Sequence, residues 1–493
     1  MLLKVITKYG LAVHLGILAA FPVAFAQFLE AGALGRVILW LSLFALIWVL
    51  FEPSIRQGER SSDARERVRD SIIRDPVFYF FLLAIGFAVV RWLNTGIALW
   101  YDPERAVWTV KDSFAPMLPA SVGSKGFLPM AASVGLGVFV IGVRHGLGLS
   151  ARRFCGMTMV TVAGIGGLMA SVCACLGAFP EMVQAARSSF TTLPFAGTPF
   201  GVFLILSIVF GVDSESHKWP LARLPFILAV GGSSSALVIF SPPFVAAVYL
   251  LVTLLVVIFS LAYNARVGSM GGFARSAVFT LLGLSVPALL IMGLSSPELQ
   301  QFKLHGLDPE SAMPVEYGPL TDALARIAKK MWLERPWCGV GVGAFGLHAP
   351  FIAAKPDWAF LPPHPVDAVS GYWTILSERG IVGCGLLAIG VGLLVWSWVM
   401  RLVEALAYLR GNDEGERLPF ACPPVVWTGP FILGLAVAEL FFSHLFASVP
   451  AVFAVVSAFA LSAASFPRNV CATLETAGAS NQGSEGQEGK DGR

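Results

Sequence analysis

The stretch from Pro76 to Leu93 reads PVFYFFLLAIGFAVVRWL and is almost entirely apolar. A helix of roughly 20 apolar residues is long enough to cross the hydrocarbon core of a bilayer. Comparable stretches recur along the whole chain, at approximate bounds 10–28, 35–52, 76–93, 127–143, 154–178, 197–212, 224–241, 243–263, 275–294, 380–402, 426–446 and 449–466. The sequence therefore predicts an all-α polytopic integral membrane protein with about twelve transmembrane helices.

Composition supports this class and excludes others. Of the residues, 56% are hydrophobic and 13% are charged, whereas a typical soluble domain has about 25% charged residues. The formal net charge is +3, and no continuous basic stripe indicates a nucleic acid as partner. The cysteines form neither a CxxC pair nor a Cys/His cluster at zinc-ligand spacing, so we expect no metal site and no disulfide framework.

The arginines predict the orientation. They gather in the connection over 53–75, and further Lys/Arg-rich connections follow the fourth, eighth and tenth predicted spans. Positively charged connections favour the cytoplasmic side. With about twelve spans, both termini are then cytoplasmic, and residues 295–379 form a large external loop between helices 9 and 10.

Four regions follow from this topology. Residues 1–294 hold transmembrane helices 1–9, 295–379 the external loop, 380–466 helices 10–12, and 467–493 a polar tail with the composition of a disordered segment. Between the seventh and eighth spans stands Ser241-Pro242-Pro243, which predicts either a tight hairpin or one broken helix.

The external loop contains an amphipathic helix. From Pro319 to Arg335, apolar residues recur at helical spacing, and Pro336 ends the pattern. Three cations, Arg326, Lys329 and Lys330, lie within one turn on the polar side. They form either an anion clamp or a solvated face with ordinary ion pairs, and the spacing alone favours the solvated face.

Two motifs follow this helix. The first is Glu334-Arg335-Pro336-Trp337-Cys338-Gly339-Val340-Gly341-Val342-Gly343-Ala344-Phe345, and the second is Ser370-Gly371-Tyr372-Trp373-Thr374-Ile375-Leu376-Ser377-Glu378-Arg379-Gly380. Together they resemble the O-antigen ligase and polymerase family of bacterial envelopes, which is similar in its Pro/Gly-x-Gly turn, its Tyr-containing helix ending in Glu-x-Gly, and its late external loop.

The resemblance implies a bacterial inner-membrane enzyme. It would transfer a glycan from undecaprenyl pyrophosphate to an acceptor glycan or lipid A-core at the outer face, among membrane lipids and without a cofactor. By the same resemblance, Arg326, Lys329, Lys330, Arg335 and Tyr372 would bind substrate, Glu378 would orient the loop at the catalytic centre, and His364, rather than His348, would assist the acceptor.

The chain also departs from the family pattern. Ser241-Pro242-Pro243 stands where the family has a Ser-Arg pair, and Val369 stands where it has a histidine. Two alternatives therefore remain: a transporter or flippase of lipid-linked sugars, and a catalytically silent homologue that scaffolds envelope assembly. Within the eleventh span, Glu439 is either a functional intramembrane carboxyl group or one merely bonded to a neighbouring helix.

Overall fold

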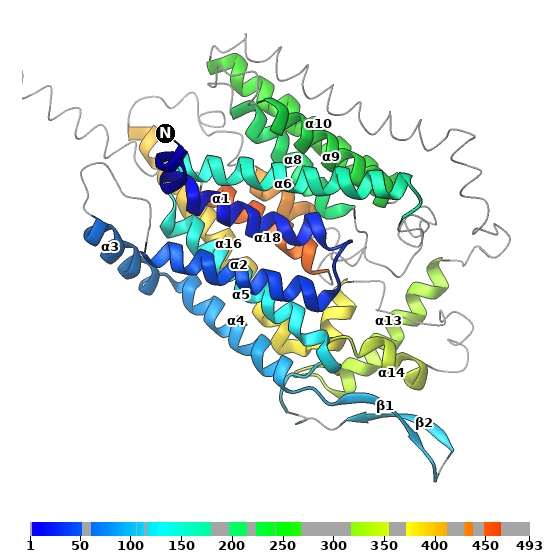
Figure 1. The fold of residues 1–493 in the computed structure, drawn as a ribbon. Helices are drawn as coiled ribbons and strands as arrows, with labels where there is room; N and C mark the ends of the chain where they lie inside the picture. Colours follow the sequence, from blue (N-terminus) through cyan, green and yellow to red (C-terminus); the bar gives the residue numbers. More distant parts are fainter. Residues whose placement is uncertain are drawn as a thin grey trace, which may run out of the picture.

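The computed structural model is a bundle of long helices with a small outer layer at one end (Figure 1). It describes residues 2–51, 61–104, 106–112, 115, 117–178, 197–213, 223–241, 243–267, 317–353, 371–411, 428–436 and 448–464. The predicted span 275–294, the tail over 467–493, His364 and Glu439 lie outside these residues.

The bundle helices match most of the predicted spans within a few residues. They are α1 (Leu2–Phe25), α2 (Ala31–Phe51), α4 (Pro76–Leu93), α5 (Phe127–Ile141), α6 (Leu149–Cys175), α8 (Thr198–Asp213), α9 (Arg223–Phe240), α10 (Pro243–Val267), α16 (Gly371–Gly411) and α18 (Val449–Ala464). Residues 428–436 are also helical. Pro243 begins α10, where a proline needs no hydrogen-bond partner for its nitrogen.

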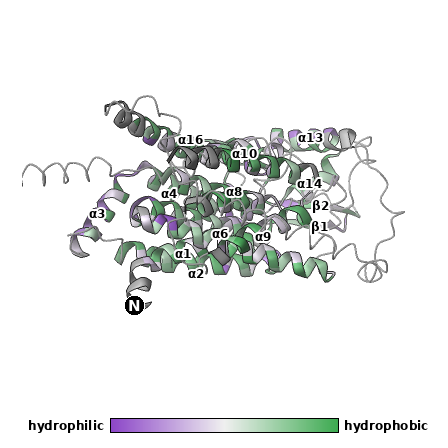
Figure 2. Cartoon of the chain, turned by 90° about the horizontal axis from the view of Figure 1, so that it is seen from above, coloured by the Kyte–Doolittle hydropathy of each residue, from purple (hydrophilic) through white to green (hydrophobic). Residues whose placement is uncertain are grey.

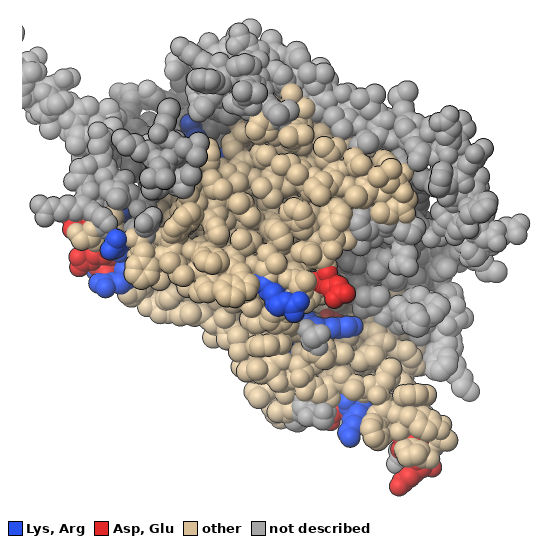
Figure 3. Space-filling model, viewed as in Figure 1, with Lys and Arg blue, Asp and Glu red and all other residues tan. Residues whose placement is uncertain are grey.

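Five of the described helices are long and apolar enough to cross a membrane: Ala31–Phe51, Pro76–Leu93, Phe127–Gly146, Ser150–Cys175 and Gly371–Val403. Large apolar side chains on the outward sides of α2 and α4 are exposed, among them Trp40 at 61% and Leu83 at 60%. On the face in Figure 3, charged side chains of the described residues lie over α3 (Ser61–Ile73) and toward the opposite end, with few between. This distribution is that of a membrane protein.

Small residues let three helices of the core approach closely. A Cβ atom added to Gly232 of α9 would lie 1.8 Å from the carbonyl oxygen of Gly164 in α6. On another side of α6, a Cβ atom on Gly166 would lie 2.5 Å from the Cα atom of Ala24 in α1. Such backbone contact between helices is common in membranes, where packing rather than the hydrophobic effect drives association.

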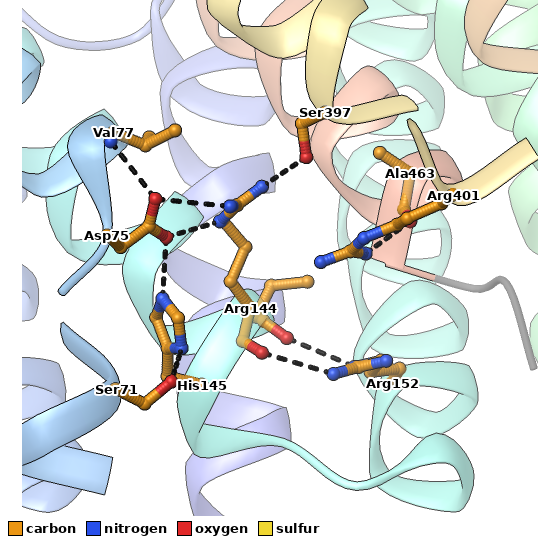
Figure 4. A network of polar contacts seen from close by, with 10 residues as sticks. Ser71, Asp75, Val77, Arg144, His145, Arg152, Ser397, Arg401 and Ala463 are labelled. Carbon is orange, nitrogen blue, oxygen red and sulfur yellow. Dashed lines mark hydrogen bonds and ion pairs between the residues drawn. The ribbon is translucent and has the colours of Figure 1, made fainter. Parts of the chain in front are cut away.

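One end of the bundle carries a buried polar network, shown in Figure 4, which we call the arginine end. Asp75, directly before α4, accepts hydrogen bonds from the Val77 backbone N–H at 3.0 Å and from Arg144 Nε at 2.8 Å. Its other near neighbour is His145 Nε2 at 2.7 Å, and His145 Nδ1 lies 2.7 Å from Ser71 Oγ of α3. Arg144 and His145 belong to a π-helix, η2 (Gly142–Gly146), that continues α5.

Two more arginines at this end hold the carbonyl groups of helix ends. Arg152 donates to the carbonyls of Val143 and Ala464, and Arg401 donates to the carbonyl of Ala463. The last carbonyls of α18 lack partners within their own helix, so these guanidinium groups satisfy them. The network thus ties α3, α4, α6, α16 and α18 together.

Replacing Asp75 by asparagine should destabilise the protein in a pH-dependent way. Burial tends to raise the pKa of this carboxyl group, but the hydrogen bond with His145 and the charge of Arg144 outweigh burial and hold the pKa well below its ordinary value of 3.8. Stability from a depressed pKa is present above the unfolded value and is lost as the pH falls below it. Removing one partner of a buried ion pair costs about 3–5 kcal/mol.

The measurement is thermal unfolding of purified Asp75→Asn and wild type at several pH values. We expect the difference in Tm to be full at about pH 7 and to shrink as the pH falls below about 4. Asp70→Asn, at a half-exposed α3 position whose ion pair with Arg69 spans 3.9 Å, is the control and should change little. A pH-independent difference between Asp75→Asn and wild type would contradict this role.

The opposite end carries the outer layer, and here the all-α prediction is wrong in one respect. Residues 97–112 form a two-stranded antiparallel sheet, with β1 (Ile97–Asp102) paired to β2 (Val107–Asp112). The same outer layer contains α13 (Tyr317–Glu334) and α14 (Phe345–Ile352), with a short 3-10 helix, η1 (Gly123–Gly126), before α5. Both strands are rich in β-branched and aromatic residues, which favour extended backbone over helix.

The predicted amphipathic helix is confirmed as α13. Leu324, Ile327 and Met331 are fully buried in a cluster that also contains Phe345 and Ile97. Burying each such side chain contributes about 1.5–3 kcal/mol. In Figure 2, hydrophilic colour marks α3 and parts of α13, whereas the bundle helices between them are mostly hydrophobic.

Candidate functional site

The glycine-rich turn over 336–343 is bonded to the start of α16. Val340 and Gly341 donate their backbone N–H groups to the carbonyls of Ser377 and Glu378, at 2.9 and 3.1 Å. In return, Ile381 and Val382 donate to the carbonyls of Pro336 and Trp337, at 2.8 and 3.0 Å. The two sequence motifs that carry the family resemblance are therefore one structural unit.

Glycine is required where these two segments touch. Gly339 has φ +70°, and a Cβ atom there would lie 2.4 Å from the carbonyl carbon of Glu378. Gly380 has φ +64° and interrupts α16, and its Cβ atom would lie 2.3 Å from the carbonyl oxygen of Trp337. Both residues combine left-handed backbone with no space for a side chain. At these two positions glycine is therefore needed for contact with the chain's own backbone.

A third segment joins the same unit. Val342 donates to the carbonyl of Ala120 and accepts from the N–H of Val122, both at 3.0 Å. Ser121 is completely buried between them and donates its hydroxyl to the carbonyl of Arg91 at 3.0 Å. The connection between α4 and α5 thus places the last turn of α4 beside the glycine-rich turn.

Glu378 lies buried inside this unit. Its Oε1 atom accepts hydrogen bonds from the backbone N–H groups of Gly343 at 2.9 Å and Phe345 at 3.3 Å. The carboxylate therefore holds the glycine-rich turn against the beginning of α14. This geometry agrees with a loop-orienting role for Glu378.

Two arginines lie within electrostatic range of this carboxylate. Arg91 is 4% exposed, its guanidinium lies within electrostatic range of Glu378 and Arg379, and its Nε atom has no hydrogen-bond partner among the described residues. The stem of Lys125 crosses Gly343, because a Cβ atom there would lie 2.4 Å from Lys125 Cδ. Arg379 is the second cation within electrostatic range of Glu378, and the exposed Lys125 lies against the glycine-rich turn that this carboxylate holds. We call Arg91, Lys125, Glu378 and Arg379 the Arg91 cluster.

Such an excess of positive charge is suited to an anion. A buried charge without enough opposite charge is costly, and an anionic ligand would supply the missing charge. Guanidinium groups bind phosphate oxygens with two parallel hydrogen bonds. The Arg91 cluster therefore has the chemistry of a phosphate site at the end of an apolar bundle.

The predicted site residues that the structure describes lie in four places. Arg326, Lys329 and Lys330 lie on the exposed side of α13, away from its buried face. Arg335 forms an ion pair with Asp112 of the sheet, and Tyr372, 40% exposed, stands at the start of α16 with its ring 5.3 Å from that of Trp373. Of the predicted site residues that the structure describes, Glu378 alone belongs to the Arg91 cluster.

Sequence reasoning missed Arg91 and Lys125, and it gave Arg379 no role. Arg91 carried a usable signal, because an arginine inside a transmembrane span marks a functional site by default. Lys125 carried none, since its position depends on the fold of the connection over 94–126. Comparison of the chain with protein-family models, curated proteins and solved structures gives no match in any of the three.

Proposed function

We propose that this protein transfers a glycan from a lipid pyrophosphate carrier to an acceptor, as the resemblance to O-antigen ligases and polymerases implies. The observation that carries the proposal is the Arg91 cluster, in which a buried arginine with an unpartnered Nε faces a single carboxylate. Undecaprenyl pyrophosphate presents the complementary charge on an apolar tail. The acceptor is a glycan or lipid A-core.

The mechanism uses the chain's own cations. As the bond between sugar and pyrophosphate breaks, negative charge develops on the departing phosphate oxygen. Arg91, Arg379 and Lys125 would stabilise that charge, while Glu378 keeps the turn in place. The acceptor hydroxyl loses its proton to a base, and histidine is suited to this role at neutral pH.

The proposal includes an orientation. The arginine end, with Arg144, Arg152 and Arg401, would face the cytoplasm, and the Arg91 cluster the outer face of a bacterial inner membrane. The missing family arginine does not weaken the proposal, because Arg91 brings a buried guanidinium from a different helix. The silent-homologue alternative rests on the absence of both the family arginine and the family histidine.

Deleting the gene and restoring it on a plasmid tests the proposed function. Without the protein, we expect carrier-linked glycan to accumulate at the outer face while the transferred or polymerised product disappears, and the plasmid should reverse both changes. Accumulation at the inner face would instead identify a flippase. An unchanged lipid-linked pool and unchanged surface glycan would contradict the proposal.

A further inference from the structure

The hairpin of β1 and β2 has two chemically different faces. Residues directly opposite each other in an antiparallel pair share a face, and neighbours along a strand alternate. The register pairs Ile97 with Asp112, Leu99 with Val110 and Tyr101 with Trp108. These six residues form one face, which we call the Asp112 face. The other face carries Trp100, whose ring lies 4.6 Å from Lys111 Nζ.

The base of the Asp112 face is fixed to the outer layer. Ile97 is 3% exposed, and Val110 packs against the cluster that contains Leu324 and Phe345. Asp112 forms an ion pair with Arg335, and its Oδ1 atom lies 4.0 Å from His348 Nε2. The hairpin therefore keeps a fixed position relative to α13 and α14.

His348 adds a second polar group at this end of the Asp112 face, and its side chain is not fully hydrogen-bonded. The residue is 9% exposed, and its Nε2 atom has no hydrogen-bond partner among the described residues. Burial lowers the pKa of His348, against an opposing effect of Asp112 and a supporting one of Arg335, which favours the neutral ring. A neutral imidazole and a carboxylate can both accept hydrogen bonds from hydroxyl groups.

The outer part of the same face is apolar and open. Leu99, Tyr101 and Trp108 are 47%, 44% and 57% exposed. The Tyr101 and Trp108 rings lie 5.3 Å apart at 60° to each other. In Figure 1 the hairpin extends beyond the end of α4, away from the bundle. Exposed aromatic groups held in a fixed arrangement indicate a binding surface.

The chemistry of this face selects the kind of ligand. A lipid surface is disfavoured, because the tip of the hairpin carries Asp102, the last residue of β1, and Glu104 of the turn, whose burial among lipids would be costly. A sugar ring has one face of C–H groups, weakly positive because each carbon bears oxygen, and aromatic faces are negative. Its hydroxyl groups need donors and acceptors such as Arg335, Asp112 and His348.

We propose that the Asp112 face binds an oligosaccharide, with sugar rings stacked on Tyr101 and Trp108 and hydroxyl groups bonded at Asp112, Arg335 and His348. The identity of this sugar as the acceptor glycan rests on the proposed function, whereas the binding itself does not. Asp112, at one end of this face, pairs with Arg335, which stands directly before the glycine-rich turn. It would therefore guide the glycan toward the Arg91 cluster.

Saturation-transfer NMR on the purified full-length protein tests the binding. The probes are chitotetraose, cellotetraose and core oligosaccharide released from lipopolysaccharide by mild acid. We expect saturable binding of at least one probe, and about tenfold weaker binding to Trp108→Ala. Trp100→Ala is the matched control, because Trp100 is 51% exposed on the other face of the same hairpin.

Three results would overturn the inference. The first is the absence of saturable binding of any probe to the wild type. The second is equal weakening of probe binding by Trp100→Ala and Trp108→Ala. The third is a wild-type dimer that the Trp108→Ala substitution dissociates. Sedimentation of both proteins detects the last. If a probe binds through Trp108 but gene deletion leaves the glycans unchanged, the proposed function fails and the sugar-binding face stands.

Discussion

Replacing Gly232 by leucine is expected to prevent the protein from accumulating in membranes. The Cβ atom alone would lie 1.8 Å from the carbonyl oxygen of Gly164, which is backbone of another helix and has no rotamer to change. α6 and α9 would have to separate, and α6 also lies against α1 at Gly166. Overpacking costs typically about 1–3 kcal/mol and more where backbone collides, against a total stability of about 5–15 kcal/mol.

Gly86→Leu is the matched control. Gly86 lies within a helix of similar composition, α4, and a Cβ atom there would meet nothing within 4 Å. We expect Gly86→Leu to accumulate as the wild type does, by immunoblot of membrane fractions and by fluorescence-detected size exclusion. Equal accumulation of the Gly232 and Gly86 variants would show that α6 and α9 do not cross as described.

Replacing Arg91 by glutamine is expected to abolish most of the proposed glycan transfer. Arg91 is buried, so water has little access to the place of its proposed contact with a phosphate group. Loss of a hydrogen bond to a charged group costs about 1.5–3 kcal/mol. Removing a group that stabilises the charge developing in the transition state lowers the rate by about 10² to 10³-fold. Arg326→Gln, on the exposed side of α13, should change transfer much less.

Complementing the deletion strain with each variant measures this effect. Arg91→Gln should reach the membrane, since the buried carboxylate Glu378 keeps its two backbone partners. Its surface glycan should resemble that of the deletion strain, whereas Arg326→Gln should restore the product. Full restoration by Arg91→Gln, or loss of the product only with Arg326→Gln, would contradict the assignment of the anion site to the Arg91 cluster and favour the cations of α13 instead.

The sequence predicted the bundle well, and the physical reason is the solvent. In lipid every backbone group must be satisfied within its own segment, so an apolar stretch such as 76–93 becomes a helix. The observed α4 has these bounds. α13 was also predictable, because Leu324, Ile327 and Met331 repeat at the helical period and pack on one face.

The outer layer was less predictable, because its form depends on contacts distant in sequence. The connection over 94–126 contains two strands rich in aromatic and β-branched residues. Their place in the outer layer depends on the ion pair between Asp112 and Arg335 and on the backbone pairing of Ser121 with Val342. The glycine-rich turn was recognised as a motif, whereas its packing against Gly380 was not. Arg91 belongs to a site because the segment that contains Ser121 holds the end of α4 beside the glycine-rich turn, and the sequence does not predict this contact.

Binding of undecaprenyl pyrophosphate to purified protein in lipid nanodiscs tests the central claim most directly. The account predicts that wild type and Arg326→Gln bind with similar affinity, and that Arg91→Gln binds at least about tenfold more weakly. Undecaprenol, which lacks the pyrophosphate, should not distinguish the three proteins. Equal affinity of wild type and Arg91→Gln for the pyrophosphate lipid would contradict the assignment of the Arg91 cluster as its binding site.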